Sequence, residues 1–350
     1  MTGVTSESIV LFVNTALLLL MCAAALGVVR LRNLFAVVML GGVYSFLMAS
    51  LMVALDAVDV GMTEAAVGAG ISVVLMLSVL GLTKTREAAP RHRPLVALVV
   101  SAVVAVSLLY ASGDLPPFGD PAAPAHQHVA PEYLARAPVE TGAPNIVTAV
   151  LASYRGYDTL GETAVILTGG IGVLVLLLGA RRRRGGVRQG GAGESPEGTG
   201  APMLRDTVIL RVGAKILLPF ILLFALYVQF HGDFGPGGGF QAGVAAATGV
   251  VLYALVFGVA SAQRVAPVRV VLVMVPLGVL IYAGTGLAGM LAGGNYLDYS
   301  VLAHDPVHGQ HWGIFAVESG VFVTVSGTML AIFYAFAGRR QAREEEGAGR

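Results

Sequence analysis

The fold of this chain is decided by two apolar runs and the short segment between them. The runs are VILRVGAKILLPFILLFALYVQF (residues 208–230) and GFQAGVAAATGVVLYALVFGVA (239–260), and the segment that joins them is HGDFGPGG (231–238). Each apolar run is about 20 residues long, the length that an α-helix needs to cross a bilayer core about 30 Å thick. The short segment between the runs contains a proline and several glycines, which favour a tight reversal. The sequence therefore predicts two membrane-spanning helices joined by a tight turn.

Composition places the whole chain in the membrane class. Of its 350 residues 56% are hydrophobic and only 12% are charged, and the mean hydropathy is +0.78, far from the profile of a soluble domain. We therefore expect an all-α, polytopic integral membrane protein with about nine transmembrane helices. The apolar runs that predict them are residues 8–29, 34–55, 61–82, 95–111, 160–179, 208–230, 239–260, 267–291 and 312–337.

Basic residues predict the orientation, since loops that carry Lys and Arg stay in the cytoplasm. In the nine-span arrangement nearly all of them fall on one side, and only Arg136 and Arg155 fall on the other. We expect an outside N-terminus and a cytoplasmic C-terminus in a multi-pass protein of the cell inner (plasma) membrane. The arginine run at 181–184 adjoins a span and is typical of a topology anchor, so no nucleic acid partner is expected.

Two polar stretches divide the chain. Residues 112–144 are rich in Pro and Ala and predict an irregular outside loop, whereas a short helix is expected near 146–153. A Gly-rich stretch after the fifth span predicts a flexible cytoplasmic linker. The expected organisation is a three-helix region 1–90, a two-helix region 91–184, the linker 185–205, a four-helix domain 206–340 and a cytoplasmic tail 341–350.

Four charged side chains fall inside the predicted spans: Glu64, Glu162, Lys215 and Glu318. A charge within a span is costly and usually faces a protein interior or a watery cavity, which makes these residues candidates for ion or proton translocation. At 1.5 Å per residue, all three carboxylates fall toward the outside ends of their helices. The alternative is structural, because a carboxylate near a helix N-terminus is stabilised by the helix dipole.

Lys215 enters the membrane from the cytoplasmic side, one turn beyond Arg211 on the same helical face. Because Pro219 has no backbone N–H, the carbonyl of residue 215 loses its usual helical partner, and we expect a kink there. A kinked and charged helix interior predicts a stopping point for a proton or an ion. The alternative is that the lysine extends to the cytoplasmic surface.

No cofactor, metal centre or enzyme active site is predicted. His304, His308 and His311 lie in YSVLAHDPVHGQHW (299–312), which contains a proline and shows no helical register. We interpret them as loop histidines at a water interface, with proton exchange as a further option. The chain contains no HExxH, GxSxG or Walker motif. GGGFQA (237–242) fits a loose dinucleotide-binding pattern, but no strand precedes it.

Small residues after the turn predict close helix packing. Gly239, Gly243, Ala246 and Ala247, with Gly249 beyond, give the seventh predicted span a face along which another helix can approach. A similar face on the third span passes through Gly68. We interpret the turn itself as a structural motif, made of Pro236, Gly237, Gly238, Gly239 and Phe240.

Three motifs together resemble one family. PGGGFQAGV (236–244), preceded by His231 and Gly232, resembles the signature of the B-type subunit of Mrp-type multisubunit Na⁺/H⁺ antiporters and of the matching subunit of membrane-bound hydrogenases. The stretch from LRNLFAVVMLGGVYSFLMA to DVGMTEAAVGAG (31–70) is similar to the small domain at the C-terminal end of the large A-type antiporter subunit. YRGYDTLGETAVI (154–166) is similar to the two-helix unit that follows that domain.

The resemblance implies a transport subunit rather than an enzyme, working inside a larger assembly related to the ion-pumping arm of complex I. Its ions would be Na⁺ and H⁺, and a large antiporter-like subunit is expected on another chain. Glu64 and Glu162 match the acidic positions of the TEAAVGAG and DTLGE motifs, which are associated with cation or proton passage. Glu318 matches an acidic position of the last helix loosely, and Lys215 matches no family motif.

This chain departs from the family just before the proline of the turn. Relatives often carry a histidine or asparagine there, whereas this chain has Asp233, Phe234 and Gly235, which argues against a titrating role for the turn. Two alternatives remain open. One is a membrane subunit of a hydrogenase or another redox-driven ion pump, and the other is a purely structural subunit whose acidic residues cap helices.

Overall fold

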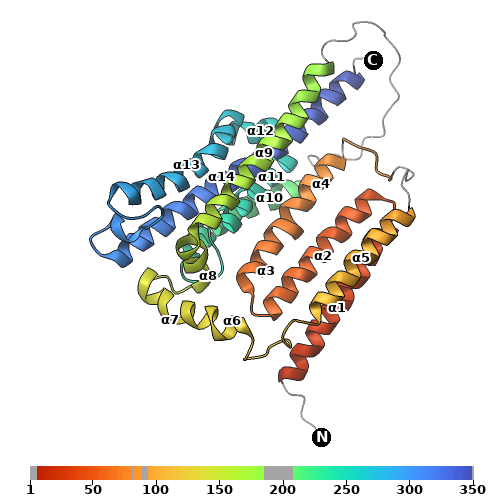
Figure 1. Ribbon diagram of the computed structural model, residues 1–350. Coiled ribbons are helices and arrows are strands. Elements are labelled where there is room, and N and C mark those ends of the chain that lie inside the picture. Colours follow the sequence, from red (N-terminus) through yellow and green to blue (C-terminus); the bar gives the residue numbers. More distant parts are fainter. Residues whose placement is uncertain (1–5, 81, 88–93, 185–207, 349–350) are drawn as a thin grey trace.

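The computed structural model describes residues 6–80, 82–87, 94–184 and 208–348, and its regular elements are all helices (Figure 1). Within this part of the chain nine helices are long and apolar enough to cross a membrane, which confirms the predicted all-α, nine-span architecture. The predicted linker at 185–205 lies outside the described residues. The elements are α1 (Ser6–Arg30), α2 (Leu34–Ala54), α3 (Val58–Glu64), η1 (Ala65–Ile71), α4 (Ser72–Leu80), α5 (Pro94–Ser112), α6 (Pro124–Gln127), α7 (Val129–Thr141), α8 (Ile146–Thr148), η2 (Ala149–Tyr154), α9 (Gly156–Arg184), α10 (Val208–His231), α11 (Gly239–Phe257), α12 (Val259–Val265), α13 (Val268–Leu291), η4 (Ser300–Leu302) and α14 (Pro306–Ala348).

Successive spanning helices run in opposite directions, so the connections between them gather at two ends of the bundle (Figure 1). One end, which we call the turn end, lies toward the lower left of Figure 1. It holds the start of α1 and the connections 55–57, 113–155, 232–238 and 292–305. The opposite end holds α12 and the C-terminal part of α14. All of the candidate functional groups that come together in the structure lie at the turn end.

The third span is a compound helix in which π-helical turns interrupt the α-helix. α3 leads into η1 and α4 without a break, so residues 58–80 form one span. Small residues of η1 and the end of α3 let α2 approach closely. A Cβ atom added at Gly61 would lie 2.9 Å from the backbone oxygen of Ala49 on α2. On its other side η1 packs against α11, and its Ile71 is fully buried. π-helical turns of this kind are frequent at functional sites.

The core of the bundle lies where α11, α13 and α14 approach one another through small residues. A Cβ at Gly243 of α11 would lie 2.9 Å from the carbonyl oxygen of Phe322 on α14, and one at Gly327 of α14 would lie 3.0 Å from the backbone nitrogen of Val275 on α13. These contacts confirm the part of the predicted small-residue face that passes through Gly239 and Gly243, and they identify α14 as the helix that packs on it. Gly249 faces Leu222 of α10 instead. Such backbone approach is a main source of helix association in lipid.

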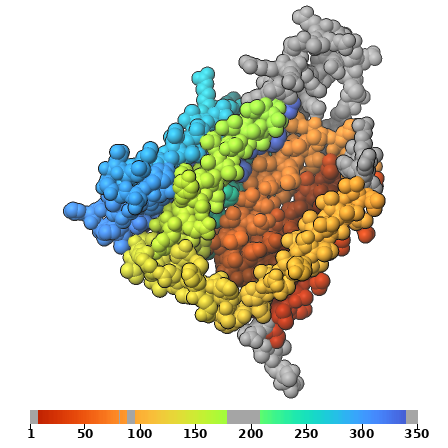
Figure 2. Space-filling model, viewed as in Figure 1, coloured from red at the N-terminus to blue at the C-terminus, as the bar shows by residue number. Residues whose placement is uncertain are grey.

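α1, α2 and α5 form one edge of the molecule, with α5 on the outside (Figure 2). Every residue of α5 from Leu95 to Ser112 is exposed, and no charged residue lies in that range. An apolar helix with no buried face is typical of a membrane span in contact with lipid or with another membrane chain. This edge therefore adds to the evidence that the bundle is embedded in a bilayer.

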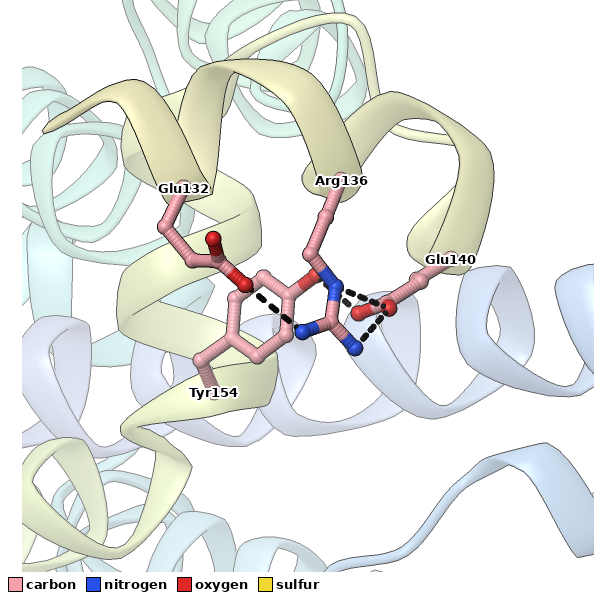
Figure 3. Close-up of polar contacts among 4 residues, drawn as sticks. All are labelled: Glu132, Arg136, Glu140 and Tyr154. Atoms are coloured by element: carbon pink, nitrogen blue, oxygen red, sulfur yellow. Dashed lines mark hydrogen bonds and ion pairs between the residues drawn. The ribbon is translucent and has the colours of Figure 1, made fainter. Parts of the chain in front are cut away.

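The predicted irregular loop at 112–144 contains two helices, α6 and α7, so this prediction was wrong. In α7 the Arg136 guanidinium lies between Glu132 and Glu140 and forms ion pairs of 2.7 Å and 2.6 Å with them (Figure 3). Ion pairs between side chains four residues apart stabilise an isolated helix. Tyr154 donates a 2.5 Å hydrogen bond to Glu140, which lowers the pKa of that carboxyl. The high Pro and Ala content of the stretch concealed this spacing.

The short helix expected near 146–153 is confirmed by α8 and η2.

Two other helix boundaries differ from the prediction. α14 begins at Pro306, so His308 and His311 lie in its first two turns and are helical instead of lying in a loop. Proline suits the first helical position because its φ is fixed and its missing N–H would have no partner there. α11 ends at Phe257 because Gly258 adopts a φ of 96°, a conformation that favours glycine and stops a helix. The seventh span therefore ends earlier than predicted.

Candidate functional site

A cavity of about 140 Å³ lies at the turn end between α3, α8, α9, α11, α13 and α14. Three acidic residues from separate helices line it, namely Asp59, Glu162 and Glu318. Residues 237–241 of the turn and the start of α11 form part of its wall. The structure therefore brings together two of the four predicted translocation residues and the part of the predicted structural motif from Gly237 to Phe240.

Glu318 is held in the cavity wall by the start of α11. The side chain is half-buried, and its Oε2 accepts a 3.0 Å hydrogen bond from the backbone N–H of Gly239, the first residue of that helix. The N-terminus of a helix carries unpaired N–H groups and a partial positive charge, so it stabilises a carboxylate placed there. This contact compensates part of the cost of keeping a carboxylate inside a membrane span.

The glycines of the turn leave the space that Glu318 occupies. A Cβ at Gly238 would lie 2.8 Å from Oε2 of Glu318, and one at Gly232 would lie 3.2 Å from the same atom. At Gly239 a Cβ would overlap the backbone oxygen of Glu318. Gly238 also adopts a φ of 114°, a conformation that strains other residues. The turn that the sequence predicts as a structural motif is therefore also the wall of the carboxylate site.

Glu162 reaches the cavity from the second turn of α9, and the residue is exposed. Two buried tyrosines fix the segment in front of it. Tyr282 of α13 donates a 2.8 Å hydrogen bond to the carbonyl of Gly156, and Tyr299 donates a 3.0 Å hydrogen bond to the carbonyl of Ala152. Because buried hydroxyl groups need such partners, these bonds anchor the start of α9 and thereby position Glu162 at the cavity.

Asp59 and Thr63 are site residues that the sequence analysis missed. They lie four residues apart on α3 and both line the cavity. Gln241 of α11 donates a 2.8 Å hydrogen bond from Nε2 to Oγ1 of Thr63, which joins the two helices. The four-residue spacing was visible in the sequence. The predicted span began at residue 61, however, and so excluded the aspartate.

Glu64 and Lys215 do not line the cavity. The Glu64 carboxylate folds over Gly68, where a Cβ would lie 2.6 Å from its Oε1, and lies beside Ser45 of α2. Lys215 is exposed on α10, which continues as a helix through Pro219 to the turn end. Among the described residues, no group of three or more His, Cys, Asp or Glu side chains has an arrangement that could hold a metal ion.

Asn145 ties the turn to the rest of the site. Its Nδ2 donates hydrogen bonds of 2.9 Å and 3.3 Å to the carbonyls of Gly235 and Gly232, and it lies 3.3 Å from Oδ1 of Asp59. Its Oδ1 accepts a 3.0 Å hydrogen bond from the N–H of Val147 and so caps α8. The half-buried side-chain amide of Asn145 thus connects α3, the start of α8 and the turn between α10 and α11, which are far apart in the sequence.

Replacing Asn145 by Ala is expected to lower the free energy of unfolding by about 2 kcal/mol, because backbone carbonyls of the turn lose their partners. Asn33→Ala is the matched control, since the side chain of Asn33 caps α2 by accepting hydrogen bonds from the N–H groups of Phe35 and Ala36, and loss of this cap should cost about 1 kcal/mol. Thermal unfolding of the detergent-solubilised protein measures both. Equal shifts for the two variants would show that the long-range bonds of Asn145 contribute nothing.

The fold and the cavity define a class, a polytopic membrane protein whose spans carry acidic residues around a cavity at one end. Family comparisons agree with this class and refine it. Residues 209–331 match the MnhB family, described as "Domain related to MnhB subunit of Na+/H+ antiporter". Residues 19–85 match MbhD, the D-type subunit of MBH, and residues 118–190 match MbhE, its E-type subunit. The chain belongs to the family of B-type subunits of Mrp-type antiporters, with regions related to further small subunits preceding the MnhB region.

Individual proteins show the same relationship. The B-type subunit of the Na(+)/H(+) antiporter of Alkalihalophilus pseudofirmus is 31% identical over 135 residues, which are 38% of this chain and 93% of that protein. A Rhizobium meliloti (strain 1021) protein, described as the combined A/B subunit of a probable K(+)/H(+) antiporter, is 28% identical over 235 residues, which are 61% of this chain and 22% of that protein.

Among solved structures, that of the Mrp complex from Dietzia sp. DQ12-45-1b contains a chain that superposes with a TM-score of 0.73 at 27% identity. The superposition covers 96% of this chain and 35% of the other. This chain therefore spans only 22% of the Rhizobium protein and 35% of the Dietzia chain, although it spans nearly all of the shorter Alkalihalophilus protein.

Proposed function

We propose that this chain is a membrane subunit of a multisubunit cation/proton antiporter that exchanges Na⁺ for H⁺, and that Glu318 carries protons at the turn end. The observation that carries the proposal is the Glu318 carboxylate itself. It is half-buried within a span, bound by the N–H of Gly239, and faces a cavity that Asp59 and Glu162 also line. Ionisable residues placed in this way within membrane spans mark ion and proton paths.

The composition of the cavity supports this function. Asp59 comes from the region that matches MbhD, Glu162 from the region that matches MbhE, and Glu318 from the region that matches MnhB. Protons that move between these carboxylates therefore pass from one region to another. We infer that the regions work as one translocation unit, in which the PGGGF turn holds Glu318 in place.

We infer that the turn end faces the outside of the cell. The opposite end carries Arg30, Arg32, Lys84, Arg264 and Arg269 in or beside its connections, and such residues stay in the cytoplasm. The cavity then exchanges protons with the external medium. We place the chain in the plasma membrane, with an outside N-terminus and a cytoplasmic C-terminus.

The proposed partners are the other subunits of an antiporter complex, including a large antiporter-like subunit that supplies the driving charge movement. Glu64 and Lys215 stay predicted translocation residues. Glu64 lies between η1 and α2, and Lys215 lies on the exposed side of α10. If they carry ions, they therefore belong to parts of the path outside the cavity.

We expect cation-dependent proton exchange from the assembled complex and none from this chain alone. The complex and the purified chain are reconstituted separately in proteoliposomes with an imposed pH gradient, and Na⁺ or K⁺ is added while the internal pH is followed by fluorescence. Because the carboxylates of this chain that line the cavity reach only one end of the membrane, the single chain lacks a complete path. Exchange by the single chain at the rate of the complex would contradict the proposal.

The matches to the MbhD and MbhE families favour a second candidate, a subunit of a redox-driven ion pump. The two functions differ in their energy source. An antiporter exchanges ions down an imposed gradient without any electron donor, whereas a redox-driven pump moves ions only while electrons flow. Exchange in the absence of a donor and an acceptor, in the experiment above, therefore selects the antiporter.

A further inference from the structure

The acidic residue of the turn, Asp233, contacts a histidine that is open to the surface. Asp233, within the turn between α10 and α11, lies 2.9 Å from Nδ1 of His311 in α14, measured at Oδ2. The His311 side chain is 54% exposed, whereas that of Asp233 is only 15% exposed. Exposure thus falls from the histidine to the aspartate, that is, from the surface toward the interior.

His311 and Glu318 share one face of α14. They are seven positions apart, which is close to two full turns and about 10 Å along the helix axis. Both face the same segment, because His311 contacts Asp233 and Glu318 contacts Gly239. Gly232, the neighbour of Asp233, is so close that a Cβ there would lie 3.2 Å from Oε2 of Glu318. Asp233 therefore contacts the exposed histidine and directly follows the residue that adjoins the cavity carboxylate.

The turn holds Asp233 in this place. Its carbonyl accepts a 3.0 Å hydrogen bond from the backbone N–H of Asn145, and the carbonyl of Gly232 accepts a 2.7 Å bond from Oγ1 of Thr148. A fixed backbone keeps the carboxylate in one position, which proton transfer requires. The sequence argued against a titrating role for this turn, whereas the contact between Asp233 and His311 places two titratable groups beside each other there.

The charges around Asp233 are suited to proton exchange. Burial raises the pKa of the Asp233 carboxyl above its ordinary value, and His311 opposes this shift. The other titratable groups near the turn are His231 at the end of α10, whose ring lies against Gly235, Asp59 of α3, which Asn145 also contacts, and Glu318. No basic side chain other than the histidines is among them, so the protonated form of Asp233 stays accessible.

We propose that His311 and Asp233 form the entry step by which protons pass between the exposed surface of the turn end and Glu318. This proposal rests on the proposed function of Glu318. A protonated His311 transfers its Nδ1 proton to Oδ2 of Asp233 and becomes neutral. The carboxylic acid then passes the proton through water to the Glu318 carboxylate, and Asp233 becomes ionised again. Release to the surface follows the same steps in reverse.

The test compares variants of the full chain in its complex, with the exchange rate per assembled complex measured from pH 6 to 9. Asp233→Asn keeps the shape and the hydrogen bond to His311 but cannot carry a proton, so we expect at least about a tenfold lower rate. His311→Gln should lower the rate less. It should also shift the pH profile upward, because Asp233 loses the neighbour that lowers its pKa. His308→Gln is the matched control, since His308 lies beside Asp305, the residue just before α14, and it should match the wild type.

A merely structural pair gives a different result. Asp233→Asn would then transport normally once assembled, and His311→Gln would keep the wild-type pH profile, which would overturn the proposal. If Asp233→Asn fails to assemble, the pH profile of His311→Gln decides alone. Glu318→Gln is measured alongside. Loss of transport there, with wild-type behaviour of both turn variants, rejects the entry step only, whereas normal transport by Glu318→Gln rejects the proposed function.

Discussion

Glu318→Gln is expected to reduce cation-driven proton exchange of the assembled complex by about a hundredfold or more, the scale on which a positioned proton carrier contributes to rate. Glutamine has nearly the same shape, and its Oε1 can still accept the hydrogen bond from Gly239. The substitution therefore removes the ionisable group and leaves the packing of α14 against α11 in place. Assembly, measured by co-purification of the partner subunits, should stay normal.

The control for this variant is Glu132→Gln. Glu132 is an exposed carboxylate at the same end of the bundle, paired with Arg136 on α7, and exposed pairs of this kind contribute little. We expect wild-type exchange from it. Wild-type exchange from Glu318→Gln as well, in a complex that assembles normally, would show that Glu318 serves only as a partner for the start of α11. The structural alternative would then be the better account of this chain.

Gly239→Ala is expected to produce the second largest effect, through sterics and not through charge. The added Cβ would overlap the backbone oxygen of Glu318, which cannot move without shifting α14. Forcing an extra methyl into close-packed helices typically costs about 1–3 kcal/mol. Here it also displaces the carboxylate from the N–H of residue 239. We expect a lower yield of assembled complex, a lower unfolding temperature and a strong loss of exchange in the complex that remains.

Gly172→Ala provides the comparison. Gly172 lies within α9, and a Cβ there would meet nothing within 4 Å. Because alanine forms helices better than glycine by about 1 kcal/mol, this variant should be neutral or slightly more stable. Equal behaviour of the two alanine variants would mean that the close approach of α11 to α14 has no energetic consequence.

The spans were predictable because a membrane helix satisfies its own backbone hydrogen bonds and needs only an apolar run of sufficient length. The small-residue face through Gly239 and Gly243 was predictable for a related reason, since helix association in lipid depends on close approach. Neither rule states which helix lies next to which. The partner of that face, α14, became known only from the structure.

The cavity could not be predicted in the same way. Asp59, Glu162 and Glu318 are each more than 100 positions from the next, and no local pattern encodes their meeting. The sequence did mark Glu162 and Glu318 as charges within spans. It named His311, with proton exchange as an option, but placed it in a loop because of the proline before it, although proline is favoured as the first residue of a helix. With the helix extended to Pro306, the spacing from His311 to Glu318 becomes meaningful.

Three matched regions of one chain meet at one cavity, so the cavity should stay assembled when the protein is diluted. The matched segment is 93% of the Alkalihalophilus protein but only 38% of this chain. Regions carried on separate chains would meet only by association between those chains. Here a single polypeptide carries all three, and covalent connection replaces that association with a local concentration set by the connecting segments. Loss of the complex on dilution should therefore not dismantle this cavity, and substitutions between the regions should appear as folding defects of one chain.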